Sequence, residues 1–288
     1  MITLEGGARV DNVLIQLDKV NKKYDGRYVL RDIALSVSRG QSTAFIGDNG
    51  SGKSTLIRIL AGLTQATSGK VQIQPGIIMN YIPERFPKMS MGPYRYIECM
   101  GRIEGLPGDA MKQRIQELFE LFHIEEMQWI PMKHLSKGTL QKVAVIQAML
   151  TEPDILFLDE PLSGQDMESQ SIFIHQVNQL RERKTAVVLA CHEKFLVHQL
   201  TDQVFELRGG QLVPVAIEDE RLVERDMLIF HGEGQLLPVP EDVMELVSCC
   251  ENKGFYIKLT ADSSKSNHVI YRMLDTGWKL REMCHENT

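Results

Sequence analysis

The sequence has few cysteines, and their spacing suits neither a disulfide framework nor a zinc site. There are five of them, an odd number, and no pair has the Cys-x-x-Cys spacing. A small secreted domain stapled by disulfides is therefore disfavoured, as is a zinc site built from cysteine pairs. We expect reduced and mostly packed thiols at Cys99, Cys191, Cys249, Cys250 and Cys284.

Long apolar runs are also missing. No stretch approaches the ~20 apolar residues that a membrane-spanning helix needs, and residues 1–7 do not combine a basic region with an apolar one. The 288 residues are 43% hydrophobic and 24% charged, which is typical of a soluble globular protein with one large domain or two smaller ones. We therefore expect the chain itself to be cytoplasmic.

An excess of positive charge is the third absence. Lysine and arginine number 32 against 38 acidic residues, so the net charge is −6, and no run of basic residues stands out. Nucleic acid is therefore not an expected partner, because its phosphates are bound by clustered cations. The short cluster from Arg181 to Lys184 is better explained as a helix end, where cations favour the helix dipole.

A glycine-rich loop after an apolar run is the most informative feature that is present. The loop from Gly47 to Thr55 reads G-D-N-G-S-G-K-S-T and fits G-x-x-x-x-G-K-[ST]. Its glycines permit positive φ angles and bring backbone N–H groups close to an anion, and the following helical pattern adds the positive end of a helix. The loop predicts a nucleotide phosphate site formed by Gly47, Asn49, Gly50, Ser51, Gly52, Lys53, Ser54 and Thr55.

Two of these side chains have more specific expected roles. Lys53 would reach the β- and γ-phosphates, and the Ser54 hydroxyl would ligate Mg²⁺. ATP and Mg²⁺ are therefore the expected substrate and cofactor.

Two carboxylates follow a second apolar run. Residues 155–158 read I-L-F-L and lead directly into Asp159 and Glu160. Ligands of open α/β sheets bind at the carboxyl ends of the strands, so Asp159 can hold Mg²⁺ and Glu160 can polarise an attacking water. Such a pair is weak by itself, because acids often end strands, but together with the phosphate loop it predicts a site of ATP hydrolysis.

The residue periodicity changes along the chain. Residues 13–20 and 28–37 alternate like an antiparallel strand pair, whereas about 88–150 have helical periodicity. The apolar runs at 155–158 and 186–190 are typical of buried parallel strands. After a turn at 208–210, strand and helix patterns predict a small α+β region. We expect one domain over 1–210, including a helical subdomain at about 88–150, and a second over 211–288.

These features resemble the nucleotide-binding subunit of an ABC (ATP-binding cassette) transporter over residues 14–207. Residues 135–139, L-S-K-G-T, stand at the position of the family signature, and 163–166, S-G-Q-D, resemble its D-loop. His192 follows a strand like the family's switch histidine, and Tyr24 lies where an aromatic ring stacks on adenine. The resemblance implies an α/β P-loop NTPase cassette with an antiparallel β subdomain, a helical subdomain and a small C-terminal α+β appendage.

The resemblance also implies roles for individual residues. Catalysis would fall to Glu160 and His192. Beyond the phosphate loop, the nucleotide would be contacted by Tyr24, Ser136, Gly138 and Asp166. The expected Mg²⁺ ligands are Ser54, Glu84 and Asp159.

The sequence departs from the family pattern in two segments. Lys137 replaces the first glycine of the family's L-S-G-G-Q signature, and Thr139 replaces its glutamine. The added cation either assists charge neutralisation or hinders close backbone approach, and both effects stay open. Glu84 stands where the family often has glutamine; a glutamate can still ligate Mg²⁺, and we interpret it as a marker of exporter-type cassettes.

The resemblance implies partners that the chain lacks. Separate transmembrane permease subunits would dock on it, with the aromatic and methionine-rich stretch at 86–96 as the candidate surface. A second ATPase subunit would pair head to tail, because each signature helix completes the other chain's ATP site; a homodimer is expected and a heterodimer stays open. The subunit would then lie on the cytoplasmic face of the cell membrane.

Export is the expected direction, since Glu84, the single short cassette and the C-terminal appendage resemble bacterial exporters. Three alternatives stay open: an importer ATPase, a soluble ABC ATPase without a transport role, and a degenerate cassette that binds ATP as a regulatory module. The net charge and the lack of long heptads disfavour the second. Intact Lys53, Asp159, Glu160 and His192 disfavour the third.

Overall fold

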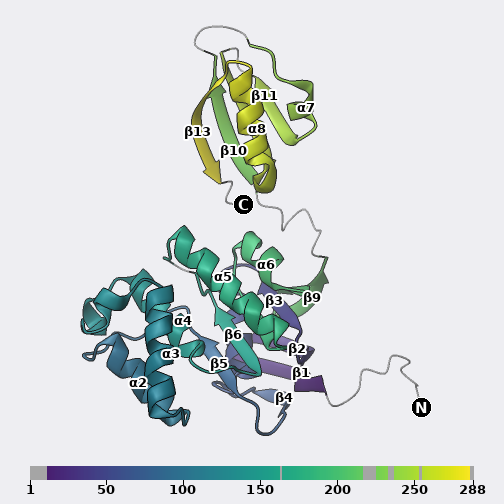
Figure 1. The fold of residues 1–288 in the computed structure, drawn as a ribbon. Helices are drawn as coiled ribbons and strands as arrows, with labels where there is room; N and C mark the ends of the chain where they lie inside the picture. Colours follow the sequence, from purple (N-terminus) through teal and green to yellow (C-terminus); the bar gives the residue numbers. More distant parts are fainter. Residues whose placement is uncertain (1–11, 163, 217–224, 233–236, 253–254, 286–288) are drawn as a thin grey trace. The chain divides into compact units, whose positions relative to one another are not determined.

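The computed structural model describes residues 12–162, 164–216, 225–232, 237–252 and 255–285. The chain divides into two compact units, Met1–Ile217 and Glu218–Thr288 (Figure 1). Among the helices in the described ranges, none is both long and apolar enough to cross a membrane.

A six-stranded sheet forms the centre of the first unit. Its strand order is β5-β6-β7-β3-β8-β9, and all neighbours are parallel except β9, which runs antiparallel to β8. Every residue of β6 and β7 is buried, which explains their continuous apolar sequences and confirms the expected buried parallel strands. The strands are β3 (Ser42–Ile46), β5 (Met79–Ile82), β6 (Ile155–Asp159), β7 (Ala186–Ala190), β8 (Gln203–Arg208) and β9 (Gln211–Val215).

A smaller antiparallel sheet shares the same hydrophobic core, and one helix contacts both sheets. Its strand order is β2-β1-β4, with β1 (Val13–Tyr24), β2 (Arg27–Ser38) and β4 (Ser68–Ile73). Leu56 and Leu60 of α1 (Lys53–Leu60) share a buried cluster with residues of both sheets, so α1 lies between them. The longer helix α5 (Met167–Glu182) and the short α6 (Lys194–Leu200) complete this part of the unit.

The helical subdomain comes from one continuous segment. It contains α2 (Pro93–Ile103), α3 (Gly108–Leu121) and α4 (Lys137–Ala148), with two short 3-10 turns, η2 (Glu125–Met127) and η3 (Met132–His134) (Figure 1). Ile115, Leu118 and Phe119, which have the predicted helical spacing, are all buried. The expected helical subdomain is therefore present as part of the fold.

The first unit ends later in the chain than the sequence analysis predicted. Strand β9 pairs with β8 through residues 204–208 and 211–215, so residues 211–215 belong to the six-stranded sheet. The predicted boundary between 210 and 211 therefore lies inside this hairpin, and the two compact units divide after Ile217. Turn residues at 208–210 indicated a break, but a tight turn joins two strands as readily as it ends a domain.

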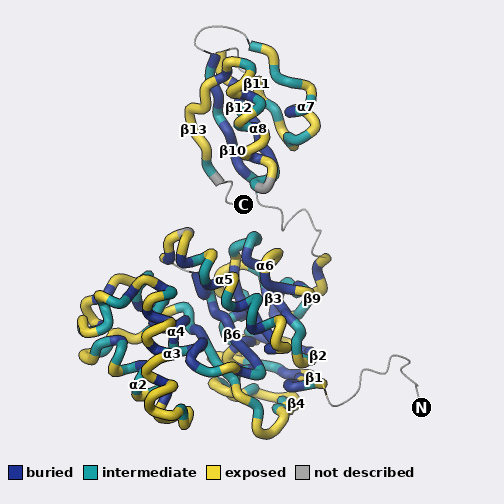
Figure 2. Tube along the Cα trace, in the orientation of Figure 1, coloured by how far each residue is buried: buried dark blue, intermediate teal, exposed yellow. Residues whose placement is uncertain are grey.

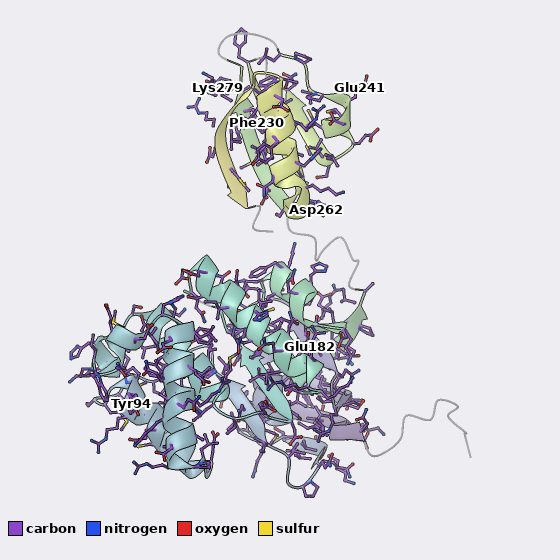
Figure 3. The ribbon with its side chains drawn as sticks, in the orientation of Figure 1. Tyr94, Glu182, Phe230, Glu241, Asp262 and Lys279 are labelled. Carbon is purple, nitrogen blue, oxygen red and sulfur yellow. The ribbon has the colours of Figure 1, made fainter. Side chains whose placement is uncertain are left out.

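The second unit is a four-stranded antiparallel sheet with helices. Its elements are β10 (Arg225–His231), α7 (Glu241–Met244), β11 (Val247–Asn252), β12 (Tyr256–Asp262), α8 (Ser263–Asp275) and β13 (Lys279–His285). The strand order β11-β12-β10-β13 with this β-α-β-β-α-β sequence is the ferredoxin-like arrangement. Buried residues of β10 and β12 form its core (Figure 2). Phe230 on β10 is one of them and lies beside α8 (Figure 3).

Trp278 provides a test of this second core. Its side chain is 1% exposed, and its Nε1 donates a hydrogen bond of 3.0 Å to the carbonyl of Pro238. Replacement Trp278→Ala should lower the free energy of unfolding of the second unit by about 3–5 kcal/mol, because it leaves a cavity and an unpaired carbonyl. Hydrogen exchange of the β10 and β12 amides in the full chain measures this loss.

The matched control is Tyr271→Ala on α8, whose side chain is 70% exposed. Its effect should stay within about 0.5 kcal/mol. Equal protection of β10 in both variants would contradict a core built around Trp278.

Candidate active site

The phosphate loop connects β3 to α1 and depends on its glycines. Gly47, Gly50 and Gly52 have φ angles of 134°, 82° and 111°, which disfavour other residues. A Cβ on Gly47 would lie 2.9 Å from the carbonyl oxygen of Leu207, and one on Gly52 would lie 2.9 Å from Val29. The loop can therefore hold its shape against β8 and β2 only with glycine at both positions.

Two polar side chains of the loop, Lys53 and Ser51, indicate that it binds an anion. Lys53 is 6% exposed, and its Nζ donates to the carbonyls of Gly47 and Asp48 at 2.6 and 3.2 Å. The hydroxyl of Ser51 is buried and has no hydrogen-bond partner among the described residues. A buried ammonium group and an unused hydroxyl suit a phosphate. The remaining predicted loop residues are the exposed Asn49 and the partly buried Thr55 in α1.

Asp159 ends β6 and is fully buried. Its Oδ1 accepts a 2.7 Å hydrogen bond from the Ser54 hydroxyl, and its Oδ2 accepts one of 2.9 Å from Tyr81. Arg58 lies 3.8 Å from Oδ2. Burial raises the pKa of Tyr81 to about 12, so its hydroxyl stays protonated and can donate to Asp159 throughout the physiological range. Sequence reasoning missed Tyr81 and Arg58, because neither belongs to a motif.

The third predicted Mg²⁺ ligand lies apart from this contact. Glu84 follows β5, and its Oε1 pairs with the guanidinium of neighbouring Arg85 at 3.5 Å. The structure therefore brings Ser54 and Asp159 together and leaves Glu84 outside their hydrogen bonds. A hydroxyl and a buried carboxylate are hard oxygen donors of the kind that Mg²⁺ prefers.

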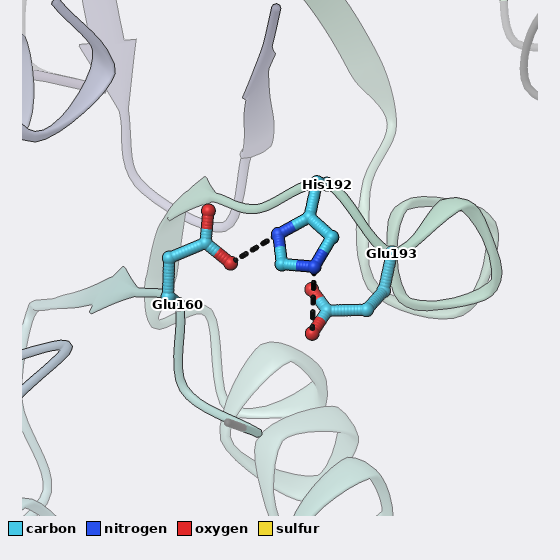
Figure 4. A group of neighbouring side chains, drawn as sticks. All are labelled: Glu160, His192 and Glu193. Atoms are coloured by element: carbon cyan, nitrogen blue, oxygen red, sulfur yellow. Dashed lines mark ion pairs between the residues drawn. The ribbon is translucent and has the colours of Figure 1, made fainter. Parts of the chain in front are cut away.

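Glu160 and His192 meet at the carboxyl ends of β6 and β7 (Figure 4). Glu160 Oε2 lies 2.8 Å from His192 Nδ1, and the backbone of Glu160 has a φ of 50°. A non-glycine residue in this left-handed region is uncommon and is often found at functional sites. Burial raises the pKa of the Glu160 carboxyl; His192 opposes this rise and the carboxylate of Glu193 adds to it. A carboxylate with a raised pKa is a stronger general base.

The signature segment begins α4. The Ser136 hydroxyl caps the helix by accepting a 3.1 Å hydrogen bond from the backbone N–H of Thr139, and the two hydroxyls lie 2.8 Å apart. The departure at Thr139 is thus accommodated by a local hydrogen bond. Gly138 leaves no room for a side chain, since a Cβ there would lie 2.3 Å from the carbonyl oxygen of Gly164.

The predicted D-loop is described only in part, because Ser163 lies outside the described residues. Asp166 caps α5: its carboxylate accepts hydrogen bonds from the N–H and hydroxyl of Ser169, and these bonds lower its pKa to about 2. Lys142 of α4 lies 3.5 Å away. Asp166 therefore has a structural role that sequence reasoning missed, although aspartate before a helical pattern is a known N-cap signal.

Tyr24 ends β1 with 47% of its surface exposed. The ammonium group of Lys22 lies 4.8 Å from the centre of its ring. An exposed aromatic face of this kind can stack on a planar base. The structure does not place it in hydrogen-bond contact with the phosphate loop.

Comparisons with known proteins agree with this geometry. The family described as ABC transporter matches residues 30–163. A zinc import ATP-binding protein of Halorhodospira halophila is 34% identical over 210 residues, covering 73% of this chain and 79% of the relative. A protein of the same name from Vibrio cholerae is 34% identical over 197 residues, covering 68% of this chain and 74% of the relative.

A solved ATP-binding subunit of an ABC transporter has 26% identity and a TM-score of 0.66, covering 72% of this chain and 91% of that one. A second solved chain, part of an ABC transporter complex of Clostridium perfringens, shares the fold with a TM-score of 0.58, covering 70% of this chain and 87% of that one, at 24% identity. Both likenesses confirm the expected α/β P-loop cassette.

The names of the relatives contradict one expectation. They are import proteins, so the expected export direction is wrong. The expectation of export was based on Glu84, the single short cassette and the C-terminal appendage. These features do not indicate direction, because no residue of an ATPase subunit need touch the cargo.

The contact between Gly138 and Gly164 can be tested directly. Gly138→Ala should force the first turn of α4 away from Gly164 and destabilise the chain by about 1–3 kcal/mol, the usual cost of overpacking. Urea unfolding of the purified chain measures the change.

Gly108→Ala at the start of α3 is the control, because a Cβ there meets nothing within 4 Å. It should be neutral or slightly stabilising. Equal midpoints and slopes for the two variants would show that α4 does not need a glycine at position 138.

Proposed function

Because the chain belongs to the ABC transporter family and is an ATPase of that family, we propose that it is the energy-supplying subunit of an importer. One observation carries the catalytic part of this proposal. Charged and titratable side chains gather at the carboxyl ends of the three adjacent strands β3, β6 and β7. The ammonium group of Lys53 comes after β3, the carboxylates of Asp159 and Glu160 stand at the end of β6, and the imidazole of His192 follows β7. Such a convergence of charge at the carboxyl edge of a parallel sheet suits phosphoryl transfer.

The nucleotide would be bound by the loop and by Tyr24. Backbone N–H groups of the loop face the phosphates, Lys53 moves from its loop carbonyls to the β- and γ-phosphates, and Ser51 gains a hydrogen-bond acceptor. Adenine would stack on the exposed face of Tyr24. Asn49, Gly50 and Thr55 complete the loop's contribution.

Hydrolysis would use the pair at the ends of β6 and β7. Glu160 accepts a proton from the attacking water, and His192 Nδ1 orients the Glu160 carboxylate from 2.8 Å. When Mg²⁺ is bound, it neutralises negative charge on the phosphates. Ser54 and Asp159 are the side chains that fit it, with Glu84 as a third oxygen donor from the next loop.

A second copy of the chain would complete each site. The exposed Ser136 and the partly buried Gly138 stand at the start of α4, whose first turn offers N–H groups to an anion. In a head-to-tail pair this turn faces the phosphate loop of the partner copy, and Asp166, beside it, approaches the same interface. Hydrolysis would then require dimerisation, and a homodimer needs no other ATPase chain.

A membrane partner would dock on the helical subdomain. Trp129, Ile130 and Met91 are 67%, 39% and 38% exposed, and the backbone joins their segments, since Met132 N–H donates to the Met91 carbonyl at 3.0 Å. The Trp129 ring lies 4.9 Å from that of Tyr94. An exposed patch of aromatic, aliphatic and thioether groups suits an amphipathic helix of a permease on the cytoplasmic face of the membrane.

The cargo would be a divalent metal ion. The relatives at 34% identity are named for zinc import, and this similarity supports zinc or a chemically similar ion as the substrate of the assembled transporter. A separate substrate-binding protein would deliver it.

Glu160→Gln should lower ATP turnover by about 100-fold or more while leaving ATP binding intact, because the amide keeps the shape but cannot accept the proton. Phosphate release by the purified chain with its permease measures turnover, and fluorescent nucleotide titration measures binding. Glu104→Gln, the same change at an exposed position after α2, is the control and should hydrolyse ATP normally. Undiminished turnover in Glu160→Gln would refute Glu160 as the general base.

The docking surface is tested by Trp129→Ala combined with Ile130→Ala. The double variant should retain at most about a tenth of the membrane partner that co-purifies in detergent, because it removes apolar contact area. Leu63→Ala, 60% exposed elsewhere on the cassette, should retain all of it. If both variants recover the same amount of a polytopic partner, docking lies elsewhere; if wild-type protein recovers none, the importer assignment fails.

A further inference from the structure

Three side chains near the end of β7 form a group that the proposed hydrolysis does not fully use. Glu160, His192 and Glu193 each offer a ligand atom, and these atoms all lie within 4.8 Å of one another (Figure 4). In the described parts of the chain, this is the only group of three or more His, Cys, Asp or Glu side chains so arranged. Glu193 has no part in the catalytic steps derived above.

We propose that Glu160, His192 and Glu193 bind a divalent transition-metal ion of the zinc type, and that this ion stops ATP hydrolysis. The inference rests on the proposed function, because it assigns a regulatory ligand to the same site. An importer of a metal ion would then be inhibited by its own accumulated cargo.

The donor set selects the class of ion. One imidazole and two carboxylates are typical ligands of zinc, iron or nickel, and three protein ligands leave a fourth position open, as in many zinc sites. Mg²⁺ prefers oxygen ligands in an octahedral arrangement, so it competes poorly for a site with an imidazole. The group therefore differs in kind from the oxygen donors Ser54 and Asp159.

The three side chains already lie close together, with the two carboxylates facing different nitrogens of the imidazole. Glu160 Oε2 lies 2.8 Å from His192 Nδ1, and Glu193 Oε1 lies 3.9 Å from His192 Nε2. Ligands of tetrahedral zinc are about 3.4 Å apart, given zinc–ligand bonds of about 2.1 Å. The His192 side chain is 68% exposed, so the imidazole can turn until one nitrogen faces both carboxylates.

The carboxylates themselves are poorly satisfied. Glu160 Oε2 and Glu193 Oε2 are both buried; the first has the ion-pair contact with His192 Nδ1, and no described group donates a hydrogen bond to the second. Buried carboxylate oxygens without donors are unfavourable, and a cation between them removes the repulsion between the two negative groups. This gives the metal ion a reason to bind here that ordinary surface acids lack.

Metal binding would change catalysis in a defined way. An ion held by Glu160 and His192 occupies the oxygen that takes the proton and the imidazole that orients it, whereas Lys53 and the phosphate loop stay free to bind ATP. Inhibition should therefore lower kcat and leave the apparent affinity for ATP nearly unchanged.

The decisive variant is Glu193→Gln, which removes one ligand outside the catalytic pair. Nucleotide-free full-length protein is titrated with Co²⁺, whose visible absorption reports the ligand set, and with Zn²⁺ in competition. Wild-type protein should show a tetrahedral or five-coordinate cobalt spectrum with one ion per chain at this site, and Glu193→Gln should bind at least about 10-fold more weakly. In ATPase assays with excess Mg²⁺, the zinc concentration for half-inhibition should rise by a similar factor.

Glu182→Gln at the exposed end of α5 is the matched control and should keep both the cobalt spectrum and the inhibition. Equal inhibition and equal cobalt binding in wild type and Glu193→Gln would overturn the proposal while leaving ATP hydrolysis, and so the proposed function, intact. If no variant hydrolyses ATP, the cobalt titration of nucleotide-free protein still decides whether the site exists.

Discussion

A fully buried carboxylate has to find its hydrogen-bond donors inside the protein, and the arrangement of the cassette depends on how Asp159 does so. Its two oxygens accept from Ser54 on α1 and from Tyr81 on β5, so one side chain joins the helix after the phosphate loop to two strands of the sheet. Loss of either donor would leave a buried charge unsatisfied, which is among the more costly defects in a protein. The same requirement places the Ser54 hydroxyl and the Asp159 carboxylate together, where a hard cation can use both.

Close backbone approach is the second constraint on the site. Gly52 abuts Val29 of β2, and Gly138 abuts the carbonyl of Gly164, so the phosphate loop and the signature helix each rest against another segment of the same chain. Movement at one segment therefore requires movement at its neighbour, because packed interiors do not deform freely. The signature helix is also joined to the loop that bears Glu84, since buried Gln141 donates a 2.9 Å hydrogen bond to the Pro83 carbonyl. Helix α4 is therefore held both against Gly164 and against the residue that precedes Glu84.

The two units also differ in charge, which an average over the chain conceals. Residues 218–288 contain 14 acidic and 8 basic residues, so the whole net charge of −6 belongs to the second unit and the cassette is neutral overall. A neutral cassette suits the proposed pairing of two copies, because net charge on both would oppose association. The ferredoxin-like unit carries its own core around Trp278 and needs nothing from the cassette to bury it.

The sequence by itself determined the phosphate loop, the buried strands and the helical subdomain, because each depends on residues within a few positions of one another. Three glycines and a lysine in nine residues suffice to predict the loop, and a period of 3.6 suffices to predict α3. Only the tertiary structure decided the donors to Asp159, the Gly138 contact with Gly164 and the place of β9 in the sheet. The residues that meet in the first two contacts lie far apart in sequence. The place of β9 depends on a Gly-Gly turn, a pattern that can either join two strands or end a domain. Neither fixed the direction of transport, for which the expectation was overturned by the names of the relatives.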